Sequence, residues 1–262
     1  MSETPRPHLK KGLGQHHLVR PELCEPLMSF LEPAGCRVIE VGSGGGVLTT
    51  LLLDRGARVH AIEMDSEWAF ALRLAERREE LAIAVADAML ISWEKLAPQT
   101  LVTGNLPYQI STALIERLLP LHALVPRASF LVQREVGERL VAPPRSQAYG
   151  SLSVLVAAYS EARLLGRVAR GSFRPAPRVQ GAFVGLRLMA PPLPEPEMRR
   201  LVKTIRLAFG LRRKTLRNAL AAGWGRERAM EVVSILGRGD RVRAEELDLD
   251  GFLELHEISS SF

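Results

Sequence analysis

The chain has 262 residues, a formal net charge of +6 and 47% apolar residues. Its length suits one large α/β domain with a smaller second domain, and its apolar content excludes an intrinsically disordered chain. The positive charge favours a polyanionic partner such as a nucleic acid, although charge alone does not identify one.

Two further features limit the class of protein. Cys24 and Cys36 are the only cysteines, too few for a disulfide framework or a zinc cage. Residues 1–14 are polar and basic, and no apolar run is long enough to span a bilayer. We therefore expect a cytoplasmic protein.

Short β-rich segments alternate with helical patterns between residues 37 and 133. The predicted strands cover 38–41, 59–64, 83–86, 101–103 and 129–132. Apolar residues at three- and four-residue spacing predict helices over 47–55, 67–80 and 112–119. This alternation is typical of βαβ units and predicts a mostly parallel sheet.

The pattern changes after residue 160. Predicted strands at 164–168 and 182–188 flank the proline-rich segment 173–177, which favours a late hairpin with an irregular loop. Prolines between 190 and 196 predict a stiff linker. Beyond it, Leu201, Ile205 and Phe209 form a helical apolar stripe that Gly210 should end. We therefore predict two domains, residues 1–189 and an all-helical domain of residues 190–262.

A glycine-rich turn follows the first predicted strand, in the sequence VIEVGSGGG at 38–46. Such a turn brings backbone N–H groups close to a nucleotide-like ligand, so Gly42 and Gly44 are candidate cofactor contacts. The glycines lack the GxGxxG spacing of a dinucleotide dehydrogenase, because position 47 is valine. Methyl transfer fits this turn better than hydride transfer.

Carboxylates end the next two predicted strands. Glu63 lies 21 positions after Gly42, where a carboxylate can accept hydrogen bonds from both hydroxyls of a ribose. Asp87 ends the third strand, where it could accept a hydrogen bond from an adenine amine. The three strand ends together predict an adenosine-containing ligand. The alternative is that each carboxylate caps the helix that follows it.

The tetrapeptide Asn105-Leu106-Pro107-Tyr108 follows the fourth predicted strand and is the most specific feature of the sequence. The resemblance of these motifs to a known family implies an adenine amine as the substrate, and such an amine is a poor nucleophile because its lone pair is delocalised into the ring. Hydrogen-bond acceptors that hold its two hydrogens favour the localised lone pair as attack proceeds. Asn105 offers a side-chain carbonyl without a buried charge, and Pro107 has no N–H to compete.

These motifs resemble those of the KsgA-type small-subunit ribosomal RNA adenine dimethyltransferases. The resemblance covers nearly the whole chain and includes Gln15, the turn at 42–46, Asn105-Leu106-Pro107-Tyr108, the segment at 147–150 and RRKTLRNAL at 212–220. It implies a Rossmann-like class I fold that uses S-adenosylmethionine. The implied reaction is methylation of adenine N6 in 16S ribosomal RNA, with dimethylation of adjacent adenines during ribosome biogenesis.

The resemblance also implies roles for individual residues. It implies that Tyr108 stacks on one face of the target base and Phe173 on the other, as in enzymes that flip a base. It implies further that Gln15, His16 and Leu18 contact the cofactor. Asn105 is a candidate for both the catalytic and the cofactor-binding role. The other candidate cofactor residues are Gly42, Gly44, Glu63 and Asp87.

The chain departs from the family pattern at the start and in the turn. His16 stands where the family has asparagine, and Ser43 and Gly45 stand where it has proline and leucine. The adjacent histidines His16 and His17 suggest a metal site. No acidic or thiol partner lies at ligand spacing, so we expect no metal there. These departures leave open a relative with altered substrate or reduced turnover.

Two basic runs favour contacts with RNA phosphates. Residues 199–217 carry eight lysines or arginines and 163–178 carry five arginines, in both cases without an acidic residue. The alternative is that these runs are ordinary solvated surfaces. The candidate RNA contacts are Lys10, Lys11, Arg174, Arg212, Arg213, Lys214 and Arg217. We expect a monomer that recognises folded RNA by shape and backbone.

Two alternatives to a small-subunit enzyme remain. An erythromycin-resistance type enzyme that methylates large-subunit ribosomal RNA shares the fold and the reaction, but the stretches at 212–220 and 149–150 favour the small-subunit type. A non-catalytic RNA-binding assembly factor with the same fold also stays open, because the residues at 16 and 17, where the family reads asparagine and phenylalanine, and at 43 and 45 are unusual.

Overall fold

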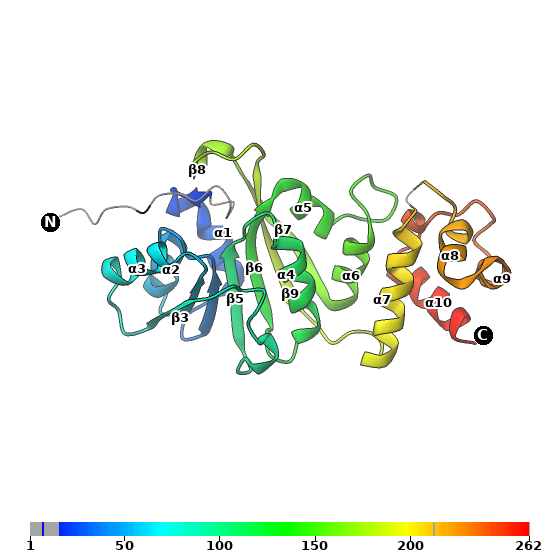
Figure 1. Cartoon of the computed structure of the whole chain (residues 1–262), viewed down its shortest axis with the longest axis horizontal. Helices are drawn as coiled ribbons and strands as arrows, with labels where there is room; N and C mark the ends of the chain where they lie inside the picture. Colours follow the sequence, from blue (N-terminus) through cyan, green and yellow to red (C-terminus); the bar gives the residue numbers. More distant parts are fainter. Residues whose placement is uncertain (1–6, 8–15, 212, 262) are drawn as a thin grey trace. The chain divides into compact units, whose positions relative to one another are not determined.

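The computed structural model describes residue 7 and residues 16–211 and 213–261 (Figure 1). Four predicted contacts, Lys10, Lys11, Gln15 and Arg212, lie outside the described residues. The described chain forms a seven-stranded sheet with flanking helices and a group of C-terminal helices. None of its helices combines the length and the apolar character needed to cross a membrane.

The seven strands lie in the order β4-β3-β2-β5-β6-β9-β7, and β1 pairs with β8 in a separate two-stranded sheet. The strands are β1 (His17–Leu18), β2 (Arg37–Val41), β3 (Arg58–Glu63), β4 (Leu81–Val85), β5 (Thr100–Asn105), β6 (Arg127–Gln133), β7 (Ser160–Val168), β8 (Phe173–Arg174) and β9 (Gly181–Leu188). All neighbours from β4 to β6 are parallel, and β9 is antiparallel to both β6 and β7. The prediction of a mostly parallel, Rossmann-like sheet with a late hairpin is confirmed.

Ten α-helices connect or follow the strands in the described chain. They are α1 (Glu25–Leu31), α2 (Val47–Asp54), α3 (Ser66–Ala75), α4 (Ser111–Leu118), α5 (Arg134–Leu140), α6 (Ser151–Tyr159), α7 (Glu195–Phe209), α8 (Leu216–Trp224), α9 (Arg226–Leu236) and α10 (Leu249–Ser260). Short 3-10 helices cover Pro21–Cys24, Trp93–Lys95, Leu119–Leu121, Arg170–Ser172 and Ala244–Glu246. Gly210 ends α7, as the sequence predicted.

The order of the strands determines where a ligand can bind. The chain runs outward from β2 through β3 to β4 and then returns to β5 on the other side of β2. Loops that leave β2 and β5 therefore diverge to opposite faces, and a crevice opens between them at the carboxyl ends of the strands. The glycine turn follows β2 and the Asn105 tetrapeptide follows β5, so the fold brings both motifs to this crevice.

One glycine is required for β2 and β5 to approach each other closely. A Cβ atom at Gly104 would lie 2.3 Å from the backbone oxygen of Val41 on β2. A contact this short with rigid backbone is not relieved by a side-chain movement. Gly104 therefore allows β5 to place Asn105 next to the end of β2.

The structure differs from the sequence prediction in three local features. The helix predicted over 67–80 ends at Ala75, because Glu76 already has an extended backbone. The proline-rich segment is not wholly irregular, since Phe173 and Arg174 pair with β1. Helices α5 and α6 were not predicted; α6 is apolar almost throughout, so it lacks the polar stripe that marks an amphipathic helix.

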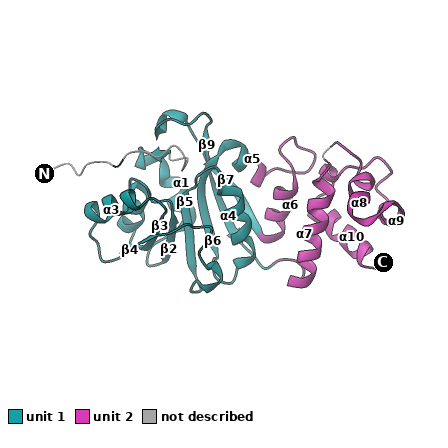
Figure 2. Cartoon of the chain, in the orientation of Figure 1, with its two compact units in different colours: residues 1–138, 160–190 teal, residues 139–159, 191–262 magenta. Residues whose placement is uncertain are grey.

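The chain divides into two compact units (Figure 2). Unit 1 comprises residues 1–138 and 160–190, and unit 2 comprises residues 139–159 and 191–262. Unit 1 contains the seven-stranded sheet, and unit 2 contains α6 to α10. The predicted division into residues 1–189 and 190–262 stays a prediction; the compact units differ from it in assigning 139–159 to the helical unit.

Candidate functional site

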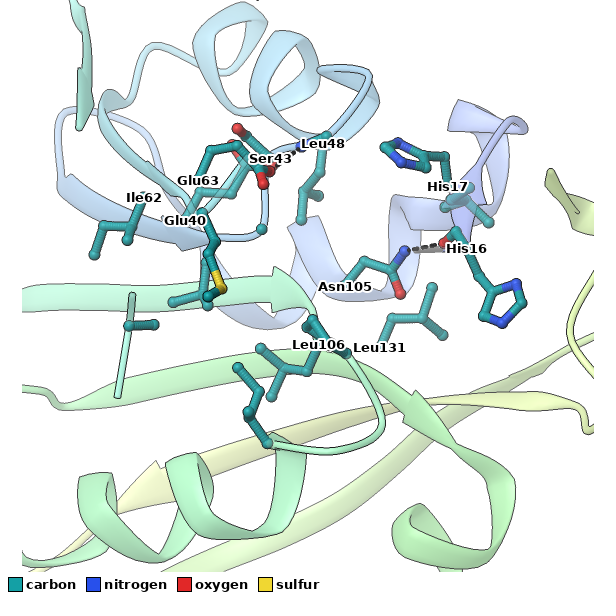
Figure 3. A pocket seen from close by; sticks show the side chains of 18 of the residues that line it. His16, His17, Glu40, Ser43, Leu48, Ile62, Glu63, Asn105, Leu106 and Leu131 are labelled. Atoms are coloured by element: carbon teal, nitrogen blue, oxygen red, sulfur yellow. Dashed lines mark hydrogen bonds between the residues drawn. The ribbon is translucent and has the colours of Figure 1, made fainter. Parts of the chain in front are cut away.

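A pocket of about 330 Å³ lies in unit 1 at the carboxyl ends of β2, β3, β4 and β5 (Figure 3). It is lined by the glycine turn, by the ends of β3 and β4, by the Asn105 tetrapeptide and by the segment around β1. Of the predicted cofactor residues, those in the described chain all line it: His16, Leu18, Gly42, Gly44, Glu63, Asp87 and Asn105. Leu106, Pro107 and Tyr108 line it as well.

The glycine turn has backbone conformations that L-residues rarely adopt. Gly42 and Gly44 have φ values of +74° and +47°. The N–H of Gly42 donates to the carbonyl of Ile62 at 2.8 Å, which fixes the turn against β3. The turn therefore offers a close backbone approach to a ligand at the end of β2.

Glu63 supports the glycine turn as well as facing the pocket. Its two carboxylate oxygens accept hydrogen bonds from the N–H of Gly44 at 2.8 Å and of Asp65 at 2.9 Å. Burial raises the pKa of Glu63, and these backbone donors oppose that shift. A carboxylate oxygen has more than one acceptor site, so Glu63 keeps capacity for a ligand hydroxyl. Glu63 thus supports the glycine turn and lines the pocket, which is more than the helix-capping role that was the alternative for this residue.

Glu40 is a buried carboxylate of the pocket that the sequence analysis missed. It lies on β2, is 1% exposed and accepts a hydrogen bond from the Thr49 hydroxyl at 2.6 Å. Burial raises its pKa to about 7, the Thr49 hydroxyl opposes the shift and the nearby Glu63 adds to it. The glutamate within the apolar strand VIEV was the signal that could have identified it. Ionisable side chains are rarely fully buried, and those that are buried occur often at functional sites.

Asp87 lies beside the pocket after β4. One of its carboxylate oxygens accepts a hydrogen bond from the N–H of Met89 at 2.8 Å, which closes a local turn. Asp87 therefore caps a turn and not a helix, as the alternative had it, and its other oxygen is left for a ligand.

The side-chain amide of Asn105 has a defined orientation. Its nitrogen donates to the backbone carbonyl of His16 at 2.7 Å, shown as a dashed line in Figure 3. An amide nitrogen can only donate, so this bond assigns the nitrogen to the His16 side and turns the oxygen away from it. The carbonyl oxygen of Asn105 is therefore left as an acceptor, and its role toward an amine substrate stays a prediction.

The rest of the tetrapeptide forms the turn into α4. The carbonyl of Pro107 accepts from the N–H groups of Ile110 and Ser111, at 3.1 and 3.2 Å. This turn does not use the carbonyl of Leu106, whose N–H donates to Leu131 at 3.0 Å and whose side chain is 1% exposed. Leu106 is thus anchored by its side chain and its N–H.

Tyr108 follows as the aromatic residue of the pocket. Its ring lies 5.7 Å from the ring of His16, measured between centroids. Its hydroxyl is buried and has no hydrogen-bond partner among the described residues. Burial raises its pKa, so the phenol stays protonated at neutral pH. Tyr108 can therefore offer both a ring face and a hydroxyl donor.

The segment that contains His16 and His17 crosses the pocket. Nδ1 of His16 lies 2.8 Å from the carbonyl of Pro175, and the backbone of His16 accepts from Asn105. His17 contacts the glycine turn, since the N–H of Gly45 donates to its Nδ1 at 3.0 Å. The segment thus connects three parts of unit 1 that are distant in the sequence. His17 was not among the predicted contacts.

The structure does not bring Phe173 to this pocket. Phe173 pairs with Leu18 across β8 and β1, is 1% exposed and packs in the hydrophobic core with Leu131, Val168 and Phe183. Pairing with β1 directs its side chain inward, so Phe173 anchors this loop to the core. Its stacking on a base stays a prediction, and the ring would have to leave the core for it.

The described basic candidates are accessible to solvent but not gathered in one unit. Arg174 in unit 1 is exposed, as are Arg213 and Lys214 in unit 2, whereas Arg217 on α8 is half-buried. Within residue 7 and residues 16–211 and 213–261, no three histidine, cysteine or acidic side chains cluster as metal ligands would.

Comparisons with known proteins place this site in a family. The family described as ribosomal RNA adenine dimethylase matches residues 7–258. "Ribosomal RNA small subunit methyltransferase A" of Rubrobacter xylanophilus is 38% identical over 257 residues, covering 97% of this chain and 95% of its own. The protein of the same name from Anaeromyxobacter dehalogenans is 40% identical over 230 residues, covering 81% and 79%.

Solved structures share the fold. A dimethyladenosine transferase from Plasmodium falciparum superposes with a TM-score of 0.77 at 24% identity, covering 92% of this chain and 96% of its own. The 23S rRNA methyltransferase ErmE superposes with a TM-score of 0.66, also at 24% identity, covering 92% and 95%. The family match and the identity to the curated relatives both extend over most of the chain, which therefore belongs to the ribosomal RNA adenine dimethylase family.

Proposed function

We propose that this protein transfers methyl groups from S-adenosylmethionine to N6 of adenines in small-subunit ribosomal RNA, dimethylating adjacent adenines during ribosome biogenesis. The orientation of Asn105 carries the proposal. Its amide nitrogen is held by the His16 carbonyl, so its oxygen is left as an acceptor beside the pocket. An acceptor of this kind suits an amine substrate.

The residues of the pocket fit S-adenosylmethionine. Gly42 and Gly44 have no side chain to fill the space at the end of β2. Glu40, Glu63 and Asp87 give the pocket an acidic character that suits a cationic ligand with hydroxyl and amine donors. The buried hydroxyls of Ser43 and Tyr108 lack partners among the described residues, so a ligand can satisfy them.

The reaction requires positioning more than acid or base chemistry. S-adenosylmethionine supplies a methyl group on a cationic sulfur, which is an electrophile without a metal or a covalent intermediate. Asn105 Oδ1 and the Leu106 carbonyl accept the two hydrogens of the adenine amine. They favour its localised lone pair, and these hydrogen bonds strengthen as positive charge grows on the nitrogen. Tyr108 supports the base by stacking.

RNA is held by cations outside the pocket. Arg174, Arg213, Lys214 and Arg217, together with Lys10, Lys11 and Arg212, contact phosphates and select folded RNA by shape. Gln15, His16 and Leu18 cover the cofactor. We place the reaction in the cytoplasm and assign it to the monomer.

The names of the relatives favour the small ribosomal subunit over the large one. Relatives at 36–40% identity are named for small-subunit methylation. The likeness to the 23S rRNA methyltransferase ErmE, at 24% identity, speaks for the fold alone. The stretch RRKTLRNAL at 212–220 also supports the small-subunit assignment.

Tritiated methyl transfer separates this function from its rivals. Purified small subunits, large subunits and protein-free ribosomal RNA are each incubated with the protein and labelled S-adenosylmethionine. The proposal expects label in small-subunit RNA and N6,N6-dimethyladenosine in its nuclease digest. Label in large-subunit RNA would support the erythromycin-resistance type instead. Binding to small subunits without label, by a protein that binds the cofactor, would support a non-catalytic assembly factor.

A further inference from the structure

His17 and the glycine turn are interlocked. The N–H of Gly45 donates to Nδ1 of His17 at 3.0 Å. A Cβ at Gly44 would lie 2.4 Å from the same nitrogen and from Cε1, so the ring occupies the space that a side chain there would need. On another side the ring packs on Trp68 of α3, with centroids 4.3 Å apart. The imidazole therefore fits one position, between α3 and the turn.

We propose that neutral His17 is a latch that holds the glycine turn in its cofactor-binding shape, and that protonation of Nδ1 opens the latch and weakens cofactor binding in acid. This inference rests on the proposed function, because it concerns regulation of the same pocket. His17 acts through the turn, so it is a positioning residue.

The latch requires one protonation state of the imidazole. Nδ1 accepts a hydrogen bond from Gly45, so it must carry a lone pair, and the proton of the neutral ring lies on Nε2. In the imidazolium both nitrogens are donors. Nδ1–H would then face the N–H of Gly45, and two donors cannot share a hydrogen bond. Since Trp68 and Gly44 confine the ring on two sides, relief requires that the ring and the turn move apart.

Movement of the turn would reach a predicted cofactor contact. The N–H of Gly44, next to Gly45, donates to Glu63 at 2.8 Å. A displaced turn therefore loosens Glu63 as well as the backbone at the end of β2. The hydrogen bond to His17 thus supports both parts of the predicted adenosine site.

Charged and titratable groups around His17 set the pH at which the latch opens. Burial lowers the pKa of His17 below its usual value of 6.5 and outweighs the carboxylate of Asp65, which raises it; His16 lowers it further. Glu63 binds the neighbouring Gly44, and Glu67 is exposed on the first turn of α3. On β8, Arg174 pairs in register with His17 but donates to the Gly171 and Phe173 carbonyls. His17 is therefore neutral at pH 7 and the latch is closed.

Two variants separate the hydrogen bond from the shape of the ring. In His17→Asn, the side-chain oxygen reaches a position near that of Nδ1 and accepts from Gly45, but it does not titrate. In His17→Phe, a ring remains on Trp68 and the acceptor is lost. Both variants retain Glu40 and Glu63, whose raised pKa values also make binding of a cationic ligand weaker in acid. Comparison with His17→Asn therefore removes the contribution of the carboxylates.

The first measurement needs no cofactor. In ¹⁵N-labelled protein titrated from pH 8 to pH 5, the amide resonance of Gly45 should shift with the same midpoint as the His17 ring, below pH 6.5. In His17→Asn the part of the Gly45 shift that follows the His17 midpoint should be lost, leaving only shifts caused by titration of Glu40 and Glu63, and the same spectra show whether each variant is folded. A wild-type Gly45 amide that ignores the titration of His17 overturns the proposal.

The second measurement is calorimetric binding of S-adenosylmethionine at pH 7.5 and pH 5.5, with each protein compared with itself. The dissociation constant at pH 5.5 divided by that at pH 7.5 should be about tenfold larger for the wild type than for His17→Asn, as expected for loss of one buried hydrogen bond. His17→Phe should show the smaller ratio of His17→Asn and weaker binding at pH 7.5 than the wild type. Equal ratios in the wild type and His17→Asn overturn the proposal.

The two measurements distinguish failure of the latch from failure of the proposed function. A wild-type protein that binds no S-adenosylmethionine at pH 7.5 contradicts the proposed cofactor, while the Gly45 titration still decides whether the latch exists. A protein that binds the cofactor but shows no coupling between Gly45 and His17 contradicts the latch alone.

Discussion

The pocket of unit 1 and the basic surface of unit 2 use different kinds of residue. In the pocket, Asn105, Glu63 and Glu40 each have a defined partner and lie at strand ends or within a strand. In unit 2, Arg213 and Lys214 are exposed beside helices whose packing does not involve them. Chemistry on a single amine needs atoms at fixed positions, whereas attraction of a polyanion needs only charge on a stable scaffold.

Tyr149 belongs to a motif of the family resemblance but has a structural role. It belongs to the segment at 147–150 that carries part of the family resemblance, yet its hydroxyl donates to the Leu247 carbonyl at 2.8 Å and its ring packs on Phe209. Burial raises its pKa to about 12. Tyr149 therefore stabilises unit 2 by packing and one buried hydrogen bond.

Of the substitutions in the two regions, Asn105→Ala in the pocket should have the largest effect on activity. Loss of an acceptor that acts in the transition state should lower the rate of methyl transfer by about 100-fold or more, while binding of S-adenosylmethionine is largely kept. Single-turnover transfer to small subunits and calorimetric binding measure the two effects. Full activity of the variant would remove Asn105 from the mechanism.

Asn105→Asp is the matched variant for this test. It keeps an acceptor oxygen but can no longer donate to the His16 carbonyl unless it is protonated. If the donor bond to His16 matters for positioning, this variant should also be slow, and its rate should rise as the pH is lowered.

Substitution of Glu40 tests whether this buried carboxyl lowers the free energy of unfolding at neutral and alkaline pH. Its pKa is about 7 in the fold against 4.5 in the unfolded chain, so the fold binds an extra proton between these values. The contribution of this group to stability is therefore highest below pH 4.5, falls as the pH rises from 4.5 to 7, and is lower by about 3 kcal/mol above pH 7. Glu40→Gln should remove this loss.

The measurement is the free energy of unfolding in urea at pH 5.5 and pH 8. We expect Glu40→Gln to be more stable than the wild type at pH 8 and to show a smaller difference between the two pH values. A wild-type pH dependence that survives in Glu40→Gln would assign it to other groups.

Tyr108→Ala should weaken the hold on the base. Stacking is worth about 1–3 kcal/mol per base, so the efficiency of methylation should fall by about 5- to 150-fold. Tyr108→Phe keeps the ring and loses the hydroxyl, and it should retain most of the activity. Equal losses in the two variants would show that the buried hydroxyl, and not the ring, is what matters.

The smallest single effects are expected in unit 2. Arg213→Ala and Lys214→Ala should each weaken binding of small-subunit RNA a few-fold. Each lost phosphate contact should also reduce the slope of the logarithm of the binding constant against the logarithm of the salt concentration by about one unit. Affinity for S-adenosylmethionine should not change. Arg238→Ala, on another part of unit 2 and paired with Glu254, serves as a control for general charge. An equal loss in that variant would contradict specific roles for 213 and 214.

The sequence was sufficient to predict the parallel sheet and most of the pocket. Residues at the carboxyl ends of parallel strands meet at one edge, so locating Glu63, Asp87 and Asn105 required only the ends of predicted strands. The tetrapeptide at 105–108 added its own chemistry. Both inferences depend on residues close together in the sequence.

The remaining features depend on contacts between distant segments. The inward direction of Phe173 follows from its pairing with Leu18, and the contact of His17 with Gly45 follows from the path of the first described residues. No local pattern contains either fact. Helix α6 was missed for a different reason, since its nearly continuous apolar sequence lacks the periodicity that distinguishes a helix from a strand.

The path of the chain between the two units limits how the protein can be divided. Residues 139–159 belong to the helical unit, although residues 160–190 return to the sheet and add β7 and β9. Helix α6 packs against α7 and α10, which are synthesised later. A fragment truncated after residue 190 would retain α6 without these partners and leave its apolar surface open to aggregation. An isolated catalytic domain for crystallisation or screening therefore requires that 139–159 be replaced by a short polar loop.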